Sequence, residues 1–232
     1  MSTPGRGGLQ AVLFDMDGLL VDSEPLWFEV ETEIMARMGS TWSRADQQHL
    51  VGGPLAHSLG YMLARATRPQ PEQTVARWMA DGITGLVRQR GVPMLPGARE
   101  LRAEVSAAGV PCALVTSAQR ELMEAVLEAI GVPFDVTVCA DDVRFGKPDP
   151  EPYLLGARRL GVDPAGCVAL EDSPNGIAAA EAAGCAVIAV PNVAPVPPRP
   201  GRVIAASLRE VTLARLRDVV GSRPNPAMTN ER

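Results

Sequence analysis

Short runs of apolar residues recur along the chain, and each is too short for an ordinary helix. Four of them are predicted to be strands: Ala11 to Phe14, Cys112 to Val115, Cys167 to Leu170 and Ala186 to Val190. A weaker fifth run, Val136 to Cys139, precedes two aspartates. Uninterrupted apolar runs, rather than alternating ones, are typical of strands buried on both faces of a parallel sheet.

Stretches with helical spacing lie between these strands. Helices are predicted over residues 97–108, 120–130, 152–160 and 175–183, and each is followed by a glycine. Glycine just beyond the last helical residue is a common helix terminator. Strand and helix therefore alternate, which predicts an α/β fold: a Rossmann-like, doubly wound parallel sheet with helices on both faces.

The segment from residue 23 to residue 95 breaks this alternation. It contains helical patterns over residues 25–38, 44–50, 54–66 and 71–89 and no convincing strand. We therefore expect a core domain (residues 9–22 and 96–220) and a small all-helical cap domain (residues 23–95) inserted after the first strand. Residues 1–8 and 221–232 are polar and are expected to be disordered tails.

Composition and charge argue against nucleic acids and membranes as binding partners. The 232 residues carry a formal charge of −5 and no dense Lys/Arg run, which argues against nucleic-acid binding and against an anionic-membrane surface. No apolar run approaches the roughly 18 residues of a membrane-spanning helix, and the first ten residues resemble no signal peptide. A cytoplasmic protein is expected, and the lack of a sustained heptad pattern favours a monomer.

Acids and hydroxyls follow the first two predicted strands. Asp15 and Asp17 follow the first strand, and alternate residues of an extended segment point to the same side. Gly18 allows a sharp turn there. Thr116 and Ser117 follow the second strand, where hydroxyls and the backbone N–H groups at the start of the next helix can hold an anion.

Two further acids and a lysine complete the candidate site. Glu171 and Asp172 follow the strand that begins at Cys167, and Lys147 lies in a loop after the weaker strand. Ligands of a parallel sheet bind beyond the carboxyl ends of its strands, so all these residues are expected in one mouth. Crowded carboxylates with no His or Cys favour Mg²⁺, and Lys147 could bring positive charge to a phosphoryl oxygen.

The segments Phe-Asp15-Met-Asp17-Gly, Thr116, Gly-Lys147-Pro-Asp-Pro and Glu171-Asp172-Ser-Pro-Asn-Gly resemble the four ordered motifs of the haloacid dehalogenase superfamily. The resemblance covers residues 9 to 215. It implies that Asp15 attacks phosphorus to form an aspartyl-phosphate. It implies too that Asp17 protonates the leaving oxygen and later deprotonates the attacking water.

The resemblance also implies a ligand set for Mg²⁺ and for phosphate. The metal would bind Asp15, the main-chain carbonyl of Asp17, and Asp172, with Glu171 either a further ligand or an acid just outside the ligand set. Thr116 and Lys147 would hold the phosphoryl group, together with the backbone at Ser117 and the turn at Gly18.

The helical insert resembles the cap of the sugar-phosphate branch, which is related to β-phosphoglucomutase. Those mutases carry a His in the first cap helix, where this chain has Trp27, and an Arg after a Lys-Gly pair, where residues 51–55 offer no cation. The segment Ser-Glu-Pro-Leu-Trp27 is similar to hexitol and 2-deoxyhexose phosphate phosphatases. The implied activity is Mg²⁺-dependent hydrolysis of a small phosphorylated metabolite, a sugar or polyol phosphate, with a sugar-phosphate mutase as the alternative.

Other functions fit the residues less well. L-2-haloacid dehalogenases lack the acid corresponding to Asp17, and phosphonatases need a cap lysine, which residues 23–95 do not contain. The non-enzyme alternatives are a response-regulator receiver and a binding protein on this fold. Receivers lack both the acid corresponding to Asp17 and a large insert. Within the insert, Glu24 is expected to cap a helix, Trp42 and Trp78 to lie in the core, and Trp27 to be close enough to face the site.

Overall fold

The computed structural model describes residues 8–50, 55–192, 195–199 and 202–222, and a six-stranded sheet runs through its centre. The strand order is β3-β2-β1-β4-β5-β6, and every neighbouring pair is parallel. The strands are β1 (Ala11–Phe14), β2 (Cys112–Val115), β3 (Val136–Val138), β4 (Cys167–Glu171), β5 (Ala186–Ala189) and β6 (Val203–Ile204). The order reverses direction between β1 and β4, which is where such sheets bind ligands.

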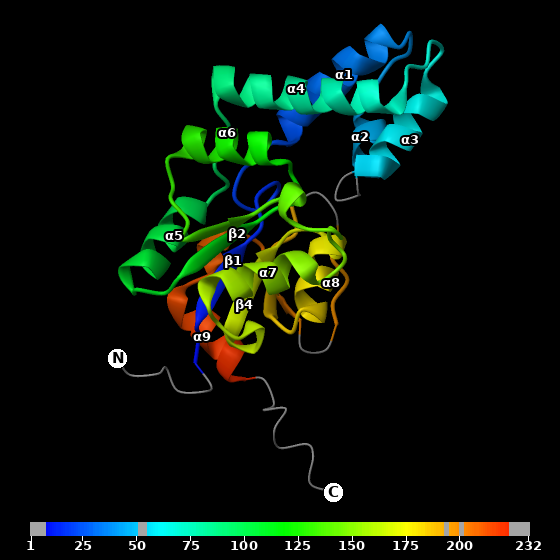
Figure 1. The fold of residues 1–232 in the computed structure, drawn as a ribbon. Coiled ribbons are helices and arrows are strands. Elements are labelled where there is room, and N and C mark those ends of the chain that lie inside the picture. The colour runs from blue at the N-terminus through cyan, green and yellow to red at the C-terminus, as the bar shows by residue number, and fades with distance from the viewer. Residues whose placement is uncertain (1–7, 51–54, 193–194, 200–201, 223–232) are drawn as a thin grey trace, which may run out of the picture.

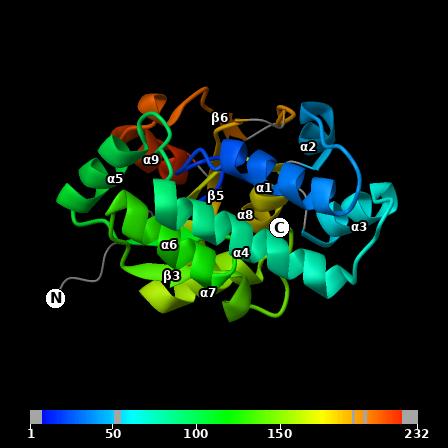
Figure 2. The same ribbon diagram turned by 90° about the horizontal axis from the view of Figure 1, so that it is seen from above.

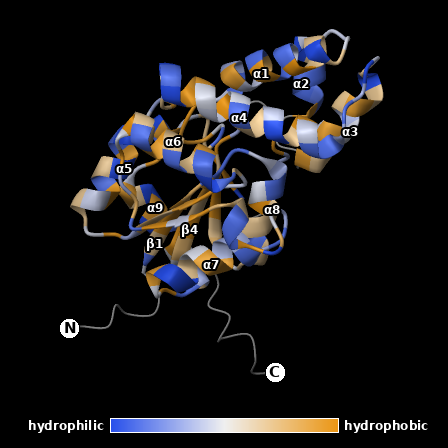
Figure 3. Ribbon diagram, turned by 45° about the horizontal axis from the view of Figure 1, so that its top comes forward, coloured by the Kyte–Doolittle hydropathy of each residue, from blue (hydrophilic) through white to orange (hydrophobic). Residues whose placement is uncertain are grey.

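Helices cover both faces of the sheet, as the alternation of apolar runs predicts. The first face is covered by α5 (Ala98–Ala107), α6 (Arg120–Ile130) and α9 (Leu213–Gly221), and the second by α7 (Glu151–Leu160) and α8 (Pro174–Ala182). The strands are mostly apolar, whereas the helices alternate between apolar and polar bands (Figure 3). The sheet therefore lies between two apolar layers.

The remaining helices lie together beyond the carboxyl ends of the strands (Figure 1). They are α1 (Glu24–Arg37), α2 (Arg44–Leu50), α3 (Leu55–Arg65) and α4 (Glu72–Arg90). Seen from above, α1 and α4 run side by side across the molecule, with α2 and α3 at one end (Figure 2). Helix α4 also packs against α6, so this group of helices rests directly on the sheet-bearing part.

The chain segments that lead into and out of these helices are joined to each other. The amide of Asp22 donates to the carbonyl of Pro93 at 2.9 Å, and the amide of Leu95 donates to the carbonyl of Leu20 at 3.0 Å. The two connections therefore run as a pair, directly beside the turn that follows β1.

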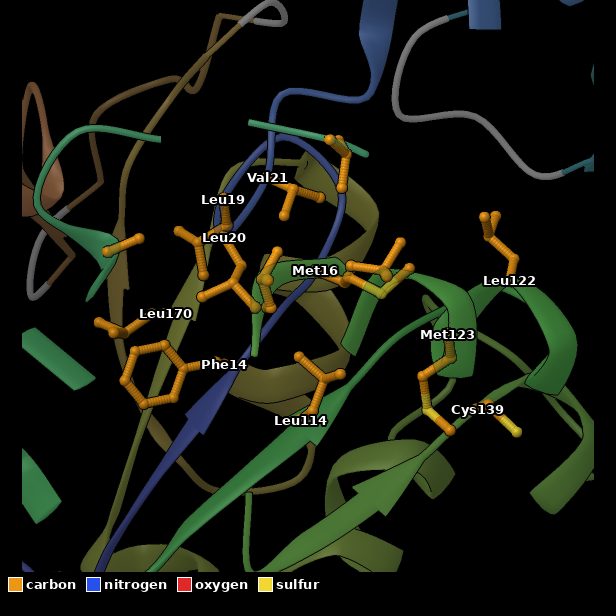
Figure 4. Close-up of a cluster of buried hydrophobic side chains, with 14 of the residues drawn as sticks. Phe14, Met16, Leu19, Leu20, Val21, Leu114, Leu122, Met123, Cys139 and Leu170 are labelled. Carbon is orange, nitrogen blue, oxygen red and sulfur yellow. The ribbon is translucent and has the colours of Figure 1, made fainter. Parts of the chain in front are cut away.

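That turn is anchored by apolar side chains. Met16, Leu19 and Leu20 have almost no exposed surface, and Figure 4 shows them gathered with Phe14 and Leu114 above the sheet. Burial of one such side chain stabilises the fold by about 1.5–3 kcal/mol. The alternation of an extended chain then turns the neighbouring acids toward the opposite side, at the rim of the sheet.

The α/β class and its parallel, doubly covered sheet are confirmed, but strand β6 and helix α9 were not predicted. Strand β6 has only two residues, and α9 begins at Leu213, well beyond the Pro-rich stretch that ends at Pro200. The domain limits, residues 9–22 with 96–220 and residues 23–95, stay a prediction. The expected tails lie almost entirely outside the described residues. No helix in the described ranges combines the length and apolarity needed to span a membrane.

Candidate active site

A cavity of about 430 Å³ lies between the carboxyl ends of the strands and the helices above them. Its lower wall includes Asp15, Asp17, Thr116, Lys147 and Asp172, so the structure brings the residues of all four motifs to one place. Strands β1, β2 and β4 are neighbours in the sheet, which explains why residues more than 150 positions apart meet here.

Lys147 links the first and last motifs. Its ammonium donates to Oδ1 of Asp15 at 2.5 Å, to Oε1 of Glu171 at 2.6 Å and to the carbonyl of Val115 at 2.9 Å. All three hydrogens of the ammonium are thus used, and its side chain is only 5% exposed. The lysine is fixed beside Asp15, the carboxylate predicted to be the nucleophile.

Glu171 is fully buried and accepts hydrogen bonds from several donors. Besides Lys147, the hydroxyl of Tyr153 donates to its Oε1, and the hydroxyl of Ser173 lies 3.3 Å from Oε2. Gly176 passes so close that a Cβ there would overlap this carboxylate. Tyr153 was not predicted as a site residue, although a hydroxyl in a helix face of otherwise apolar residues is a signal that a buried partner exists.

Asp17 is held from the side of the inserted helices. The hydroxyl of Ser23 donates to its Oδ1 at 2.5 Å, and hydrogen bonding by Trp27 acts on the same carboxylate. Trp27 lines the cavity, so its expected position facing the site is confirmed. Trp42 is buried, as expected, and Trp78 packs partly buried against the core.

The turn at Gly18 and the end of β2 shape the rest of the lower wall. Gly18 has a φ of 79°, and a Cβ there would overlap the carboxylate of Asp172, so only glycine fits this position. Thr116 Oγ1 accepts from the amide of Ala118 at 3.0 Å. Thr116 and Ser117 both line the cavity.

Burial dominates the protonation equilibria of the acids. It raises the pKa of Asp15 to about 7, although the Lys147 ammonium opposes the rise. Burial and the neighbouring carboxylates of Asp15 and Glu171 raise the pKa of Asp172 to about 9. Burial also raises the pKa of Asp17 against the hydrogen bond from Ser23. Burial alone would lower the pKa of Lys147, but its two carboxylate partners outweigh it and raise that pKa.

These residues fit a hard divalent cation. Asp15, Glu171 and Asp172 each offer an oxygen, and these oxygens lie within 4.8 Å of one another. Asp172 forms no ion pair within the described part of the chain, and Lys147 is already shared by the other two acids. Mg²⁺ prefers oxygen ligands, and its charge would offset the excess of carboxylates over the single lysine.

The upper wall of the cavity contains acids that were not predicted as site residues. Glu24 and Glu31, both from α1, line the cavity. Gln47 donates from Nε2 to the carbonyl oxygen of Glu24 at 2.8 Å and to Oε2 at 3.1 Å, and Trp42 donates to Oε2 of Glu31 at 2.9 Å. The interpretation of Glu24 as a helix cap is wrong: Ser23 occupies the cap position, and the Glu24 side chain lines the cavity.

Comparison with known proteins agrees with this geometry. The family of haloacid dehalogenase-like hydrolases matches residues 12–190. Hexitol phosphatase B of Escherichia coli (strain K12) is 36% identical over 228 residues, which span 95% of this chain and 100% of that protein. Both the superfamily and the branch predicted from the motifs are therefore confirmed.

Two crystal structures of CbbY from Rhodobacter sphaeroides have the same fold. The complex with phosphate is 31% identical, with a TM-score of 0.80 over 90% of this chain and 99% of that one. The complex of a CbbY mutant with xylulose-(1,5)bisphosphate is 30% identical, with a TM-score of 0.81 over the same shares. With the motifs assembled in one cavity and a family match across most of its length, this chain belongs to the haloacid dehalogenase-like hydrolases.

Proposed function

We propose that the protein is a Mg²⁺-dependent phosphatase that hydrolyses monophosphate esters of sugars or polyols through an aspartyl-phosphate. The observation that carries the proposal is the placement of Asp15, which lies at the end of β1 with Lys147 2.5 Å away and faces a cavity large enough for a small metabolite. The phosphatases among its relatives support the substrate class.

Asp15 supplies the nucleophile in the first step. One of its carboxylate oxygens attacks phosphorus, the bond from phosphorus to the ester oxygen breaks, and the leaving alkoxide takes a proton from Asp17. Burial keeps the pKa of Asp17 raised, which favours the protonated form that this step needs. Ser23 orients the carboxyl group by donating to Oδ1.

Asp17 acts in the opposite direction in the second step. It takes a proton from a water molecule as the water oxygen attacks phosphorus, and the bond between phosphorus and Asp15 breaks. Inorganic phosphate leaves, Asp15 returns as a carboxylate, and Asp17 is protonated again. The same acid therefore serves both half-reactions.

We assign the phosphoryl oxygens to Thr116, Lys147 and the backbone N–H group at Ser117. The predicted contact from Gly18 is not supported, because its amide donates to the carbonyl of Val21 at 3.0 Å. Lys147 also neutralises part of the repulsion between the carboxylate and the substrate's dianion. Glu171 already accepts hydrogen bonds from Lys147 and Tyr153, so we assign it the role of positioning the lysine rather than binding the metal.

Asp15, Asp172 and the main-chain carbonyl of Asp17 would hold Mg²⁺. When bound, the ion supplies positive charge that offsets the crowded carboxylates and the phosphoryl oxygens. Asp15 is proposed both as the nucleophile and as a metal ligand, so the positive charge of the ion would act close to the phosphorus.

Release of inorganic phosphate from a panel of sugar, polyol and nucleotide monophosphates, with Mg²⁺ and with EDTA, tests the proposal. We expect metal-dependent release, fastest from sugar or polyol monophosphates. Isomerisation of a sugar phosphate that needs a bisphosphate activator, without phosphate release, would instead identify a mutase. The segment at residues 51–54 that bears on this distinction in the sequence lies outside the described residues.

A further inference from the structure

Two carboxylates face the cavity from the upper wall. Glu24 and Glu31 come from α1 and are seven residues apart, and residues at this spacing lie on one face of a helix. Among the described residues of the insert that line the cavity, none is a lysine or an arginine. The part of the wall that the insert contributes is therefore acidic, and the nearby Arg44 interacts with Glu24 without lining the cavity.

Both carboxylates are held in place by neutral donors. Trp42 donates to Oε2 of Glu31, which is only 6% exposed. Gln47 donates to Oε2 of Glu24, and its own oxygen accepts from Arg44 at 3.1 Å. Each carboxylate is thus oriented through one oxygen, which leaves its second oxygen for a ligand in the cavity.

A carboxylate oxygen of this kind accepts hydrogen bonds and repels anions. Hydroxyl groups on a carbon chain are suitable donors, and a hydrogen bond to a charged acceptor is stronger than one between neutral groups. Burial raises the pKa values of Glu24 and Glu31 to about 7, and the guanidinium of Arg44 opposes the rise at Glu24. A second phosphate group bound beside Glu24 and Glu31 would meet two like charges, and the arginine in the cavity lining, Arg144, comes from the core and not from the insert.

We propose that Glu24 and Glu31 bind the hydroxyl groups of the substrate's carbon chain and select polyhydroxylated monophosphates over bisphosphates. This inference rests on the proposed phosphatase function, since it assumes that the phosphoryl group occupies the lower wall. Gln47 and Trp42 act as positioning residues for the pair. The comparisons leave both substrate classes open, because one relative is a hexitol phosphatase and another binds a bisphosphate.

Binding can be measured separately from hydrolysis in an Asp15→Asn variant. In that background with Mg²⁺, calorimetry would compare sorbitol 6-phosphate with inorganic phosphate. At pH 8, above the raised pKa of Glu31, adding Glu31→Gln is expected to weaken sorbitol 6-phosphate binding about tenfold, because a neutral amide replaces a charged acceptor. Binding of inorganic phosphate should stay the same. Unchanged affinity for sorbitol 6-phosphate after both Glu31→Gln and Glu24→Gln would overturn the inference.

Glu33→Gln is a matched control, because Glu33 lies on the same helix but is exposed and pairs with Arg37 at 2.5 Å. It should leave both affinities unchanged. Because this assay involves no turnover, failure of the wild-type protein to release phosphate would count against the phosphatase and not against this subsite. Tenfold tighter binding of glucosamine 6-phosphate than of glucose 6-phosphate would show that the pair binds ammonium groups, which also overturns the inference.

Discussion

The two walls of the cavity hold carboxylates in opposite ways. At the lower wall, Asp15 and the buried Glu171 share the ammonium of Lys147, and oxygens of Asp15, Glu171 and Asp172 lie close enough together to suit Mg²⁺. On the upper wall, Glu24 and Glu31 are held by an amide and an indole. The positive charge of Lys147 among the acids of the lower wall suits a phosphate dianion. The neutral donors of the upper wall leave its two acids able to accept hydrogen bonds from uncharged groups. The proposed chemistry and the proposed selectivity therefore rest on different parts of the chain.

The largest expected effect comes from the lower wall. Replacing Asp15 with Asn removes the nucleophile, so the rate of phosphate release should fall by about three orders of magnitude or more. The fold should persist, with an unchanged circular dichroism spectrum. Asp81→Asn, an exposed change of the same kind in α4, should keep full activity. Residual turnover near the wild-type rate in clean Asp15→Asn would rule out the proposed nucleophile.

Magnesium should act on the lower wall only. At about one hundred times its dissociation constant, Mg²⁺ should stabilise the folded protein by about 2.7 kcal/mol, which raises the melting temperature by about 5–10 °C. Asp172→Asn should abolish this shift and EDTA should reverse it, whereas Glu31→Gln should retain it. A shift that survives in Asp172→Asn would place the metal elsewhere.

Tyr153 tests whether Glu171 acts by positioning Lys147. Tyr153→Phe keeps the ring, over which Lys147 lies at 5.0 Å, and removes the hydroxyl that donates to Glu171. We expect kcat to fall about tenfold with little change in KM, because the loss of one hydrogen bond to a charged group disturbs the lysine. Tyr61→Phe, which removes a hydroxyl bonded to Asp46 at 2.9 Å, should leave kcat unchanged. Equal kcat values in the wild type, Tyr153→Phe and Tyr61→Phe would contradict the role of Glu171 in positioning Lys147.

The smallest effect concerns stability on the upper wall. Burial raises the pKa of Glu31 from 4.5 to about 7, so the folded state binds the proton more tightly than the unfolded state does. This favours the folded state below pH 4.5, and the advantage is lost as the pH rises to about 7. Glu31→Gln should therefore be more stable than the wild type by about 1–3 kcal/mol at pH 8 and nearly equal to it at pH 4.5, measured by urea unfolding. A constant difference at both pH values would contradict the shifted pKa.

The sequence predicted the lower wall because its residues follow strands. Asp15, Thr116 and Glu171 each come directly after a continuous apolar run, with Asp172 one residue further, and the carboxyl ends of parallel strands meet at one edge. The α/β class follows from the same runs. Strand β6 escaped prediction because two residues are too few to form a pattern.

The upper wall could not be predicted in the same way. Whether Glu31 faces the cavity depends on how α1 packs against α4, and this is set by contacts between residues far apart in sequence. The bond between Trp42 and Glu31 spans eleven positions, and that between Gln47 and Glu24 spans 23. Tyr153 was missed for the same reason, since its partner Glu171 lies on a different element.

The two connections to the inserted helices run side by side, and their position bears on how Asp17 is supported. The segments at Asp22 and Leu95 are each hydrogen-bonded to the other connection, so the chain enters and leaves the inserted helices at one place, beside the turn that carries Asp17. Ser23 and Trp27, which hold Asp17, lie just past this place. The support of Asp17 therefore comes from the inserted helices and not from the sheet alone.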